Sequence, residues 1–135
     1  EKIKNKYPKM VNKAVNLIEN DNYKTTKQDQ SKGSYYGKRT PEDGNIDWNQ
    51  SAKDIYNLIR AVSHPYPGAF TYSDDQKVMI WKAKVIDKNK PKAKPGEVIK
   101  KEYNNFVVQC KENQLLITDY DTGININVGD ILNEE

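Results

Sequence analysis

The chain has few of the residues that most often build reactive centres. Its 135 residues include one cysteine, Cys110, and one histidine, His64. A single cysteine excludes an intrachain disulfide, and these two residues do not supply the Cys and His clusters that hold zinc. Because Cys110 ends the apolar run Phe106 to Cys110, we interpret it as a small buried side chain and not as a reactive thiol.

Long apolar runs are also absent. Hydrophobic residues make up 36% of the chain and charged residues 30%. No stretch approaches the roughly 20 apolar residues of a membrane span, and the lysine-rich start lacks the apolar centre of a signal peptide. We therefore expect a cytoplasmic protein without membrane contact. The apolar residues that remain are regularly patterned, which excludes a wholly disordered chain.

Motifs for phosphate, metal or acid-base chemistry are missing too. The sequence has no glycine-rich phosphate loop, and Asp119 to Gly123 has too few acidic residues for a calcium loop. His64 directly precedes Pro65, a position more typical of a residue at a helix end than of a general base. We predict no metal site and no catalytic residue in this chain.

The local signals are strongest between residues 35 and 70. Thr40 to Gly44 has turn chemistry, and we expect Gly44 to adopt a positive φ. Ser51 and Asp54 form a capping box that predicts a helix beginning at Ala52. The apolar stripe of this helix consists of Ile55, Leu58, Ile59 and Val62. We expect the helix to end at the corner formed by residues 64–68, because its prolines forbid helical geometry.

A second helix and several strands are expected around this segment. Pro8 suits the first turn of a helix whose apolar stripe includes Val11, Val15 and Ile18. We expect strands at 34–36, 46–48, 69–72, 76–86, 105–110, 114–120 and 124–128, and one that begins at Val98. In strand 76–86, alternation places Met79, Trp81, Ala83 and Val85 on one face, with Trp81 in the core, and Lys82 and Lys84 on the other face.

These elements predict a mainly β protein with helices. Short antiparallel strands without room for crossover helices favour a small open barrel of the OB type with one packed helix. An N-terminal helix and a polar linker precede it. We divide the chain into a helix at 1–19, a linker at 20–45 and the barrel domain at 46–135.

The segments TPEDGNIDW, starting at Thr40, and LIRAVSHPYPGAF, ending at Phe70, resemble the C-terminal domain of the folate-dependent formyltransferases. This family includes methionyl-tRNA formyltransferase and the enzyme that formylates UDP-4-amino-4-deoxy-L-arabinose. The wording YYGKRTPEDG, starting at Tyr35, is closer to the amino-sugar branch. The same barrel architecture is implied by the resemblance.

The resemblance implies a reaction that moves a formyl group from 10-formyltetrahydrofolate to an amine. It also implies that the catalytic Asn, His and Asp belong to an N-terminal Rossmann-like domain, of which residues 1–19 resemble the last helix. We expect this chain alone to be inactive and to hold no cofactor. The corner toward the catalytic domain or the substrate cleft is expected to include Arg60, His64, Tyr66 and Gly68.

A basic segment offers a different function. Between Trp81 and Lys101 the chain has eight lysines and two acidic residues, which is typical of a solvated loop but also fits an anion site. The candidate anion-binding residues are Lys82, Lys84, Lys90, Lys92 and Lys94. Three functions therefore remain open: part of an enzyme cleft, an RNA-binding module with weak nonspecific binding, and an interaction domain that forms a homodimer. The two matched segments favour the first.

Overall fold

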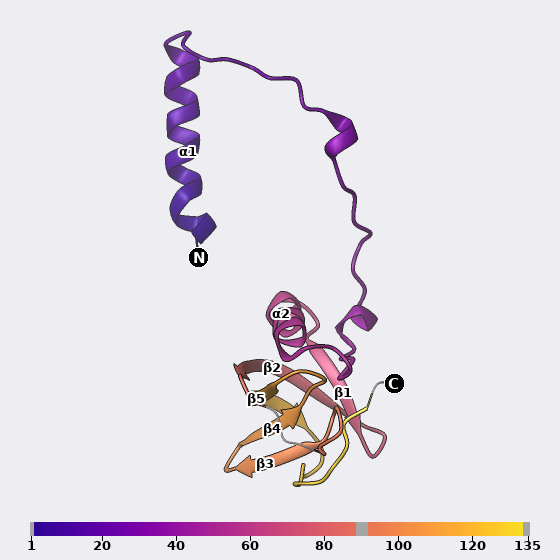
Figure 1. The fold of residues 1–135 in the computed structure, drawn as a ribbon. Coiled ribbons are helices and arrows are strands. Elements are labelled where there is room, and N and C mark those ends of the chain that lie inside the picture. The colour runs from indigo at the N-terminus through magenta and orange to yellow at the C-terminus, as the bar shows by residue number, and fades with distance from the viewer. Residues whose placement is uncertain (1, 89–91, 134–135) are drawn as a thin grey trace. The chain divides into compact units, whose positions relative to one another are not determined.

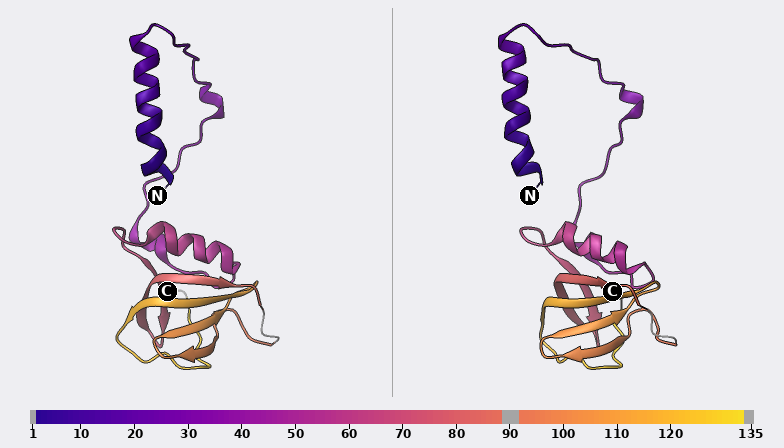
Figure 2. Two further views of the ribbon diagram at one scale, coloured as in Figure 1. Left: turned by 90° about the vertical axis from the view of Figure 1, so that its left-hand side faces the viewer. Right: turned by 60° about the vertical axis from the view of Figure 1, so that its left-hand side comes forward.

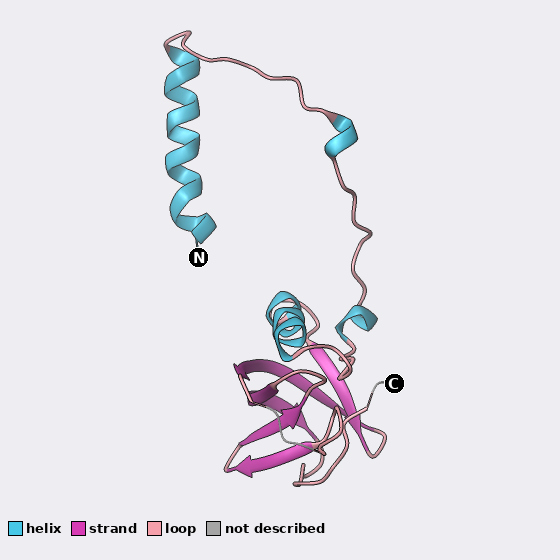
Figure 3. Ribbon diagram, viewed as in Figure 1, coloured by secondary structure: helices cyan, strands magenta, loops and turns pink. Residues whose placement is uncertain are grey.

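The computed structural model describes residues 2–88 and 92–133. The chain forms two compact units, one ending at Gly37 and one beginning at Lys38 (Figure 1). The first unit has the helix α1 (Lys2–Glu19) and a single turn of 3-10 helix, η1 (Gln30–Lys32). The second unit has the short η2 (Pro41–Gly44), the helix α2 (Ala52–Val62) and all five strands (Figure 3). The proposed division at 1–19, 20–45 and 46–135 stays a prediction.

Helix α1 is longer than Pro8 suggested. It begins at Lys2, so that Pro8 lies inside the helix and not in its first turn. Several of its large apolar side chains are exposed, including Ile3 at 76% and Met10 at 65%. Residues 34–36, expected as a strand, have no regular structure. Tyr35 and Tyr36 are 90% and 92% exposed, so an apolar pair alone did not indicate a strand here.

The second unit is built on one antiparallel sheet in the order β1-β2-β5-β4-β3. Its strands are β1 (Ala69–Ser73), β2 (Gln76–Ile86), β3 (Val98–Glu102), β4 (Asn105–Gln109) and β5 (Gln114–Thr122). The expected bounds of the long strand 76–86 and the hairpin of β4 with β5 are confirmed. With its packed helix, this sheet confirms the expected mainly β, open barrel-like fold (Figure 2).

A register shift in β2 changes which side chains face the core. Ile80 pairs with Tyr120, but Ala83 pairs with Ile117, so the pairing is irregular around Trp81 and Lys82. The core face therefore carries Val78 and Ile80 before the shift and Ala83 after it. The expectation that Met79, Trp81, Ala83 and Val85 share one core face is wrong, because a bulge reverses the alternation. Trp81 is only half-buried.

The C-terminal segment links the two edges of the sheet. Asn133 exchanges two backbone hydrogen bonds with Tyr72 on β1, at 2.9 and 3.0 Å. A few residues earlier, Gly129 and Asp130 bond to Val98 on β3 at 2.8 and 2.9 Å. The strand expected at 124–128 is not formed, because these residues pair with no neighbouring strand. Isolated bridges further along the segment close the sheet instead, and they satisfy edge groups that would otherwise be open.

Helix α2 packs against β2, with β1 and β5 beside it (Figure 2). Ser51 Oγ accepts from the Asp54 amide at 3.2 Å, which confirms the predicted start. The Asp54 carboxylate accepts from the Ser51 hydroxyl at 2.6 Å. Ile55 and Ile59 join the core completely, whereas Leu58 is partly buried at its border. None of the described helices is long and apolar enough to cross a membrane.

Residues 46–48 do not form the expected strand. Ile46 is buried at 0% exposure and Trp48 at 3%, so the apolar anchors were identified but not the backbone. Their backbone makes single hydrogen bonds and no ladder: the Ile46 amide donates to the Phe70 carbonyl at 2.9 Å, and the Trp48 carbonyl accepts from the Lys111 amide at 3.2 Å. The Trp48 indole N–H donates to Thr71 Oγ1 at 3.0 Å, so both backbone and side-chain contacts hold this segment.

Candidate functional site

A tight corner connects α2 to β1. The Gly68 amide donates to the carbonyl of Val62 at 2.8 Å, and the Tyr66 amide donates to that of Ser63 at 3.2 Å. These two bonds fold residues 63–68 back on the helix end. Gly68 has a φ of 97°, a conformation that side chains with a Cβ rarely adopt. Pro65 and Pro67 have no amide donor, so neither residue can continue the helical hydrogen bonding of α2.

Trp81 holds this corner from the side of the sheet. The His64 ring stacks on the Trp81 ring with centroids 4.0 Å apart and an interplanar angle of 15°. A Cβ on Gly68 would lie 2.6 Å from the Trp81 ring. Ser63 Oγ donates to the Trp81 carbonyl at 3.2 Å, and the indole N–H donates to Asp121 at 2.7 Å. The stack packs the His64 ring against the sheet.

The segment around η2 meets the same corner. A Cβ on Gly44 would lie 2.3 Å from the Gly68 carbonyl oxygen, so only glycine lets the two backbones approach this closely. Gly44 is not among the residues with positive φ, and the expectation of a positive φ there is wrong. The Thr40 amide donates to Asp43 at 2.7 Å. A hydrogen bond from the Thr40 side chain lowers the pKa of Glu42.

A cleft of about 550 Å³ lies between η2 and the end of α2. One wall comes from residues 38–44 and the other from residues 61–68. Its lining residues are Lys38, Arg39, Thr40, Pro41, Gly44, Ala61, Val62, Tyr66, Pro67 and Gly68. The walls are mostly apolar, and the side chains that add charge or an aromatic ring are Lys38, Arg39 and Tyr66. This combination is suited to an anionic ligand with an apolar part.

The structure separates the four residues expected at the corner. Tyr66 and Gly68 line the cleft, whereas His64 and Arg60 are not among its lining residues. Arg60 lies over the Tyr56 ring at 5.2 Å and donates to Asn57 at 3.2 Å. Lys38 and Arg39 also line the cleft, although they were not among the site residues predicted from the sequence. Their place directly before the TPEDG segment was the only signal for them.

The basic segment is partly neutralised by acidic neighbours. Lys82 forms a 2.8 Å ion pair with Asp119, which faces it from β5. Lys100 forms a 2.6 Å ion pair with Glu102. The other candidate anion-binding residues, Lys84, Lys92 and Lys94, are exposed, while Lys90 lies outside the described residues. Whether these lysines bind an anion stays a prediction.

Metal ligands and a reactive thiol are the other groups that could support chemistry. Among the described residues, no group of His, Cys, Asp and Glu is arranged to hold a metal ion. Cys110 is a buried free thiol, and burial raises its pKa to about 12. A thiol in that state is a poor nucleophile at neutral pH.

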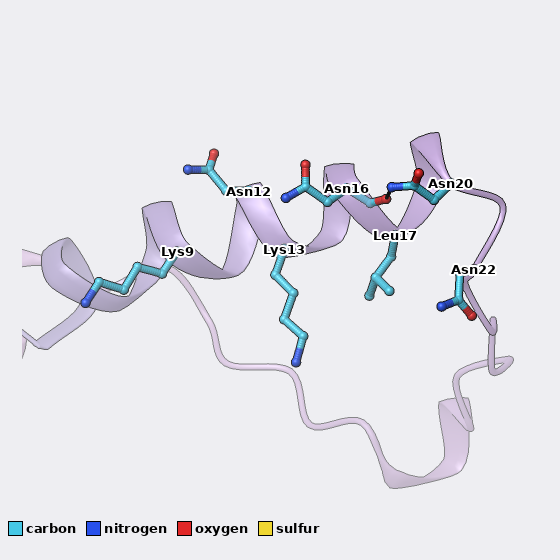
Figure 4. A pocket seen from close by; sticks show the side chains of 7 residues that line it. All are labelled: Lys9, Asn12, Lys13, Asn16, Leu17, Asn20 and Asn22. Carbon is cyan, nitrogen blue, oxygen red and sulfur yellow. Dashed lines mark hydrogen bonds between the residues drawn. The ribbon is translucent and has the colours of Figure 1, made fainter.

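A shallow hollow of about 620 Å³ lies along α1 and the turn that follows it (Figure 4). Lys9, Lys13 and Leu17 border it from the helix, and Asn22 borders it from the turn. The Asn20 side chain donates to the Asn16 carbonyl at 2.7 Å, which caps the helix end. Most of these side chains are exposed, so the hollow has the character of open helix surface. The cleft of the second unit is the better candidate site.

Both the family model and a curated relative that match this chain point to one family. Residues 38–134 match the model of the formyl transferase C-terminal domain. The bifunctional polymyxin resistance protein ArnA of Wigglesworthia glossinidia brevipalpis is 48% identical over 84 residues, which are 62% of this chain and 12% of that protein. The chain therefore spans about one eighth of the length of this relative.

Solved structures resemble the chain in fold. A variant of HypX from Aquifex aeolicus matches with a TM-score of 0.58 and 22% identity over 84% of this chain and 20% of HypX. HypX in complex with tetrahydrofolic acid matches with a TM-score of 0.57 and 21% identity over 92% of this chain and 21% of HypX. At this identity the likeness concerns the fold alone.

Proposed function

Because this chain belongs to the formyl transferase C-terminal domain family, we propose that it is the C-terminal part of an enzyme that moves a formyl group from 10-formyltetrahydrofolate to an amine. The observation that carries the proposal is the family match over residues 38–134, which includes both the corner and the cleft. The folate donor in this proposal is the one implied by the resemblance to the formyltransferases; HypX, which shares the fold, was solved with tetrahydrofolic acid.

We propose that this domain shapes a substrate cleft and does not carry out the chemistry. The described residues that line the cleft include no carboxylate, imidazole or thiol, so they offer no general base for an amine near neutral pH. The ring of His64 is stacked on Trp81. The groups that accept the amine's proton and polarise the formyl carbonyl belong, in this proposal, to an N-terminal Rossmann-like domain.

An amino-sugar nucleotide is the acceptor we favour. The 48% identity with ArnA, whose name refers to polymyxin resistance, supports this branch of the family, as does the YYGKRTPEDG segment. Methionyl-tRNA is the second candidate, because the lysines of the basic segment could contact RNA phosphates. The ion pairs of Lys82 with Asp119 and of Lys100 with Glu102 weaken that alternative, because these charges are already compensated.

A domain exchange tests the proposal. Residues 38–133 of this chain replace the matching segment of the formyltransferase that acts on UDP-4-amino-4-deoxy-L-arabinose. We expect the chimera to formylate the amino sugar from 10-formyltetrahydrofolate, and the 135-residue chain alone to show no turnover. A second chimera carrying Gly44→Val is the control, because the larger side chain should separate the backbones of the cleft. A well-folded first chimera without activity, or turnover by the chain alone, would contradict the proposal.

A further inference from the structure

The cleft carries two cations on one wall and an aromatic ring on the other. Lys38 and Arg39 come from the segment before η2, and Tyr66 comes from the corner after α2. Among the described residues, neither cation has an acidic partner within ion-pair distance. The Tyr66 side chain is 62% exposed. The cleft thus presents, at the same place, an open ring and two cations that form no ion pair with the acidic residues that the structure describes.

The rest of the lining complements a flat ligand. Pro41, Ala61, Val62 and Pro67 are apolar. Gly44 lies against the Gly68 carbonyl where the two walls meet. Because neither residue has a side chain, no side chain fills the cleft at this point. Apolar walls and an aromatic ring favour a planar group, while a guanidinium forms two parallel hydrogen bonds with a carboxylate or a phosphate. The Thr40 hydroxyl is a further polar group of the lining.

We propose that this cleft binds a small ligand that combines a flat aromatic ring with at least two negative charges. The ring lies against Tyr66, and the charges meet Lys38 and Arg39. This inference rests on the proposed function, in whose reaction two ligands have this chemistry. One is the nucleoside diphosphate part of the acceptor, and the other is the aminobenzoyl-glutamate part of the folate.

Binding titrations of the full chain with single probes test this inference. The probes are UDP, tetrahydrofolate, uridine and inorganic phosphate, followed by calorimetry or by chemical shifts of the cleft residues. We expect UDP or tetrahydrofolate to bind with a dissociation constant near the millimolar range. Uridine lacks the charges and phosphate lacks the ring, so both should bind far more weakly. The better of the first two probes identifies the source of the ligand.

Matched variants locate the binding. The pair Lys38→Gln and Arg39→Gln should weaken binding about tenfold, the size expected for two partly exposed ion pairs. Tyr66→Ala should weaken it as well, while Tyr66→Phe should not. Lys53→Gln with Lys111→Gln removes the same charge elsewhere on the second unit, and Tyr103→Ala removes a ring that is 97% exposed. These controls should bind as the unchanged chain does.

Several outcomes would overturn the inference. They are the absence of binding by both UDP and tetrahydrofolate, equal binding of inorganic phosphate, and equal weakening by the control variants. All the lining residues belong to the second unit, so the test needs no catalytic domain. It measures binding and not formyl transfer, and its failure therefore leaves the result of the domain exchange unaffected. An inactive chimera would likewise not change the result of the binding titrations.

Discussion

Gly44 and Gly68 touch through their backbones, so that a Cβ on Gly44 would lie 2.3 Å from the Gly68 carbonyl oxygen. The two glycines belong to the two segments by which the sequence resembles the formyltransferases, TPEDGNIDW and LIRAVSHPYPGAF. Their contact explains why each segment has glycine at this position. It also forms the junction between the walls of the cleft.

Alanine at Gly44 should destabilise the second unit. The clash is with a backbone oxygen, which cannot rotate away, so we expect the free energy of unfolding to fall by about 1 to 3 kcal/mol. Gly68→Ala should have at least this effect, because it adds a Cβ at a φ of 97° and against the Trp81 ring. Gly123→Ala is the matched control, since nothing lies within 4 Å of its Cβ position. Urea denaturation measures all three, and equal midpoints would contradict the contact.

Substitutions in α2 should rank by burial. Ile59 is 1% exposed, so Ile59→Ala should lower the free energy of unfolding by about 2 to 5 kcal/mol. Leu58 is partly buried, and Leu58→Ala should lower it by about 1 to 2 kcal/mol. Asn57 lies on the exposed side and should tolerate alanine within about 0.5 kcal/mol. A different order in thermal or urea unfolding would show that the helix presents another face to the sheet.

The stack of His64 on Trp81 should be measurable as a coupling energy. Ring pairs of this kind contribute about 0.5 to 1.5 kcal/mol beyond their burial. A double-mutant cycle with His64→Ala and Trp81→Ala should therefore be non-additive by about that amount. The same cycle with His64→Ala and Tyr103→Ala is the control and should be additive, because the side chain of Tyr103 is 97% exposed. Additivity in both cycles would show that the stack of His64 on Trp81 does not stabilise the corner.

Cys110 should resist thiol reagents in the folded protein. Burial raises the pKa of its thiol to about 12, whereas an exposed cysteine has a pKa of about 8.5. Labelling at pH 8 should thus be no faster than unfolding.

The same shift gives a dependence of stability on pH. The stability that the neutral Cys110 thiol contributes is fully present below the pKa of the unfolded chain, about 8.5. It is lost as the pH rises toward the folded value of about 12. Between about pH 8 and pH 10 the unfolding free energy of the unchanged chain should therefore fall relative to that of Cys110→Ala. A constant difference would contradict the burial of the thiol.

RNA binding should be weak and sensitive to salt. Residues 92–96 carry two lysines and no arginine or aromatic residue, so contacts there would neutralise phosphates without stacking on bases. Each phosphate contact with a duplex would contribute about −0.9 to the slope of log affinity against log salt. We expect no preference for initiator tRNA at about 0.15 M salt, where the screening length is about 8 Å.

A filter-binding or anisotropy titration measures that preference. The variant for it changes Lys90, Lys92 and Lys94 to glutamine, with Lys53→Gln as a single-charge control outside the segment. Tight, selective binding that disappears in the triple variant would favour the tRNA branch of the family over the amino-sugar branch.

The sequence alone located the elements whose signals are local. The start of α2 was predictable because Ser51 lies three residues before the amide it caps. The strand 76–86 was predictable because apolar and polar residues alternate along it and turn residues precede and follow it. The two segments that resemble the formyltransferases also identified the family. All these signals are contained within a few neighbouring residues, so no knowledge of distant contacts was needed.

The tertiary structure decided which side chains meet at the corner after α2 and at the cleft. A bulge next to Trp81 moved this residue out of the core and under His64, and no residue type near Trp81 indicates a bulge. The cleft brings Lys38 and Arg39 opposite Tyr66, and Gly44 lies against Gly68, so it joins segments far apart in the sequence. Such contacts depend on how the sheet pairs and closes, because the pairing register sets which face each side chain occupies. That register is determined by the packing of the whole unit, and a single stretch of sequence does not contain it.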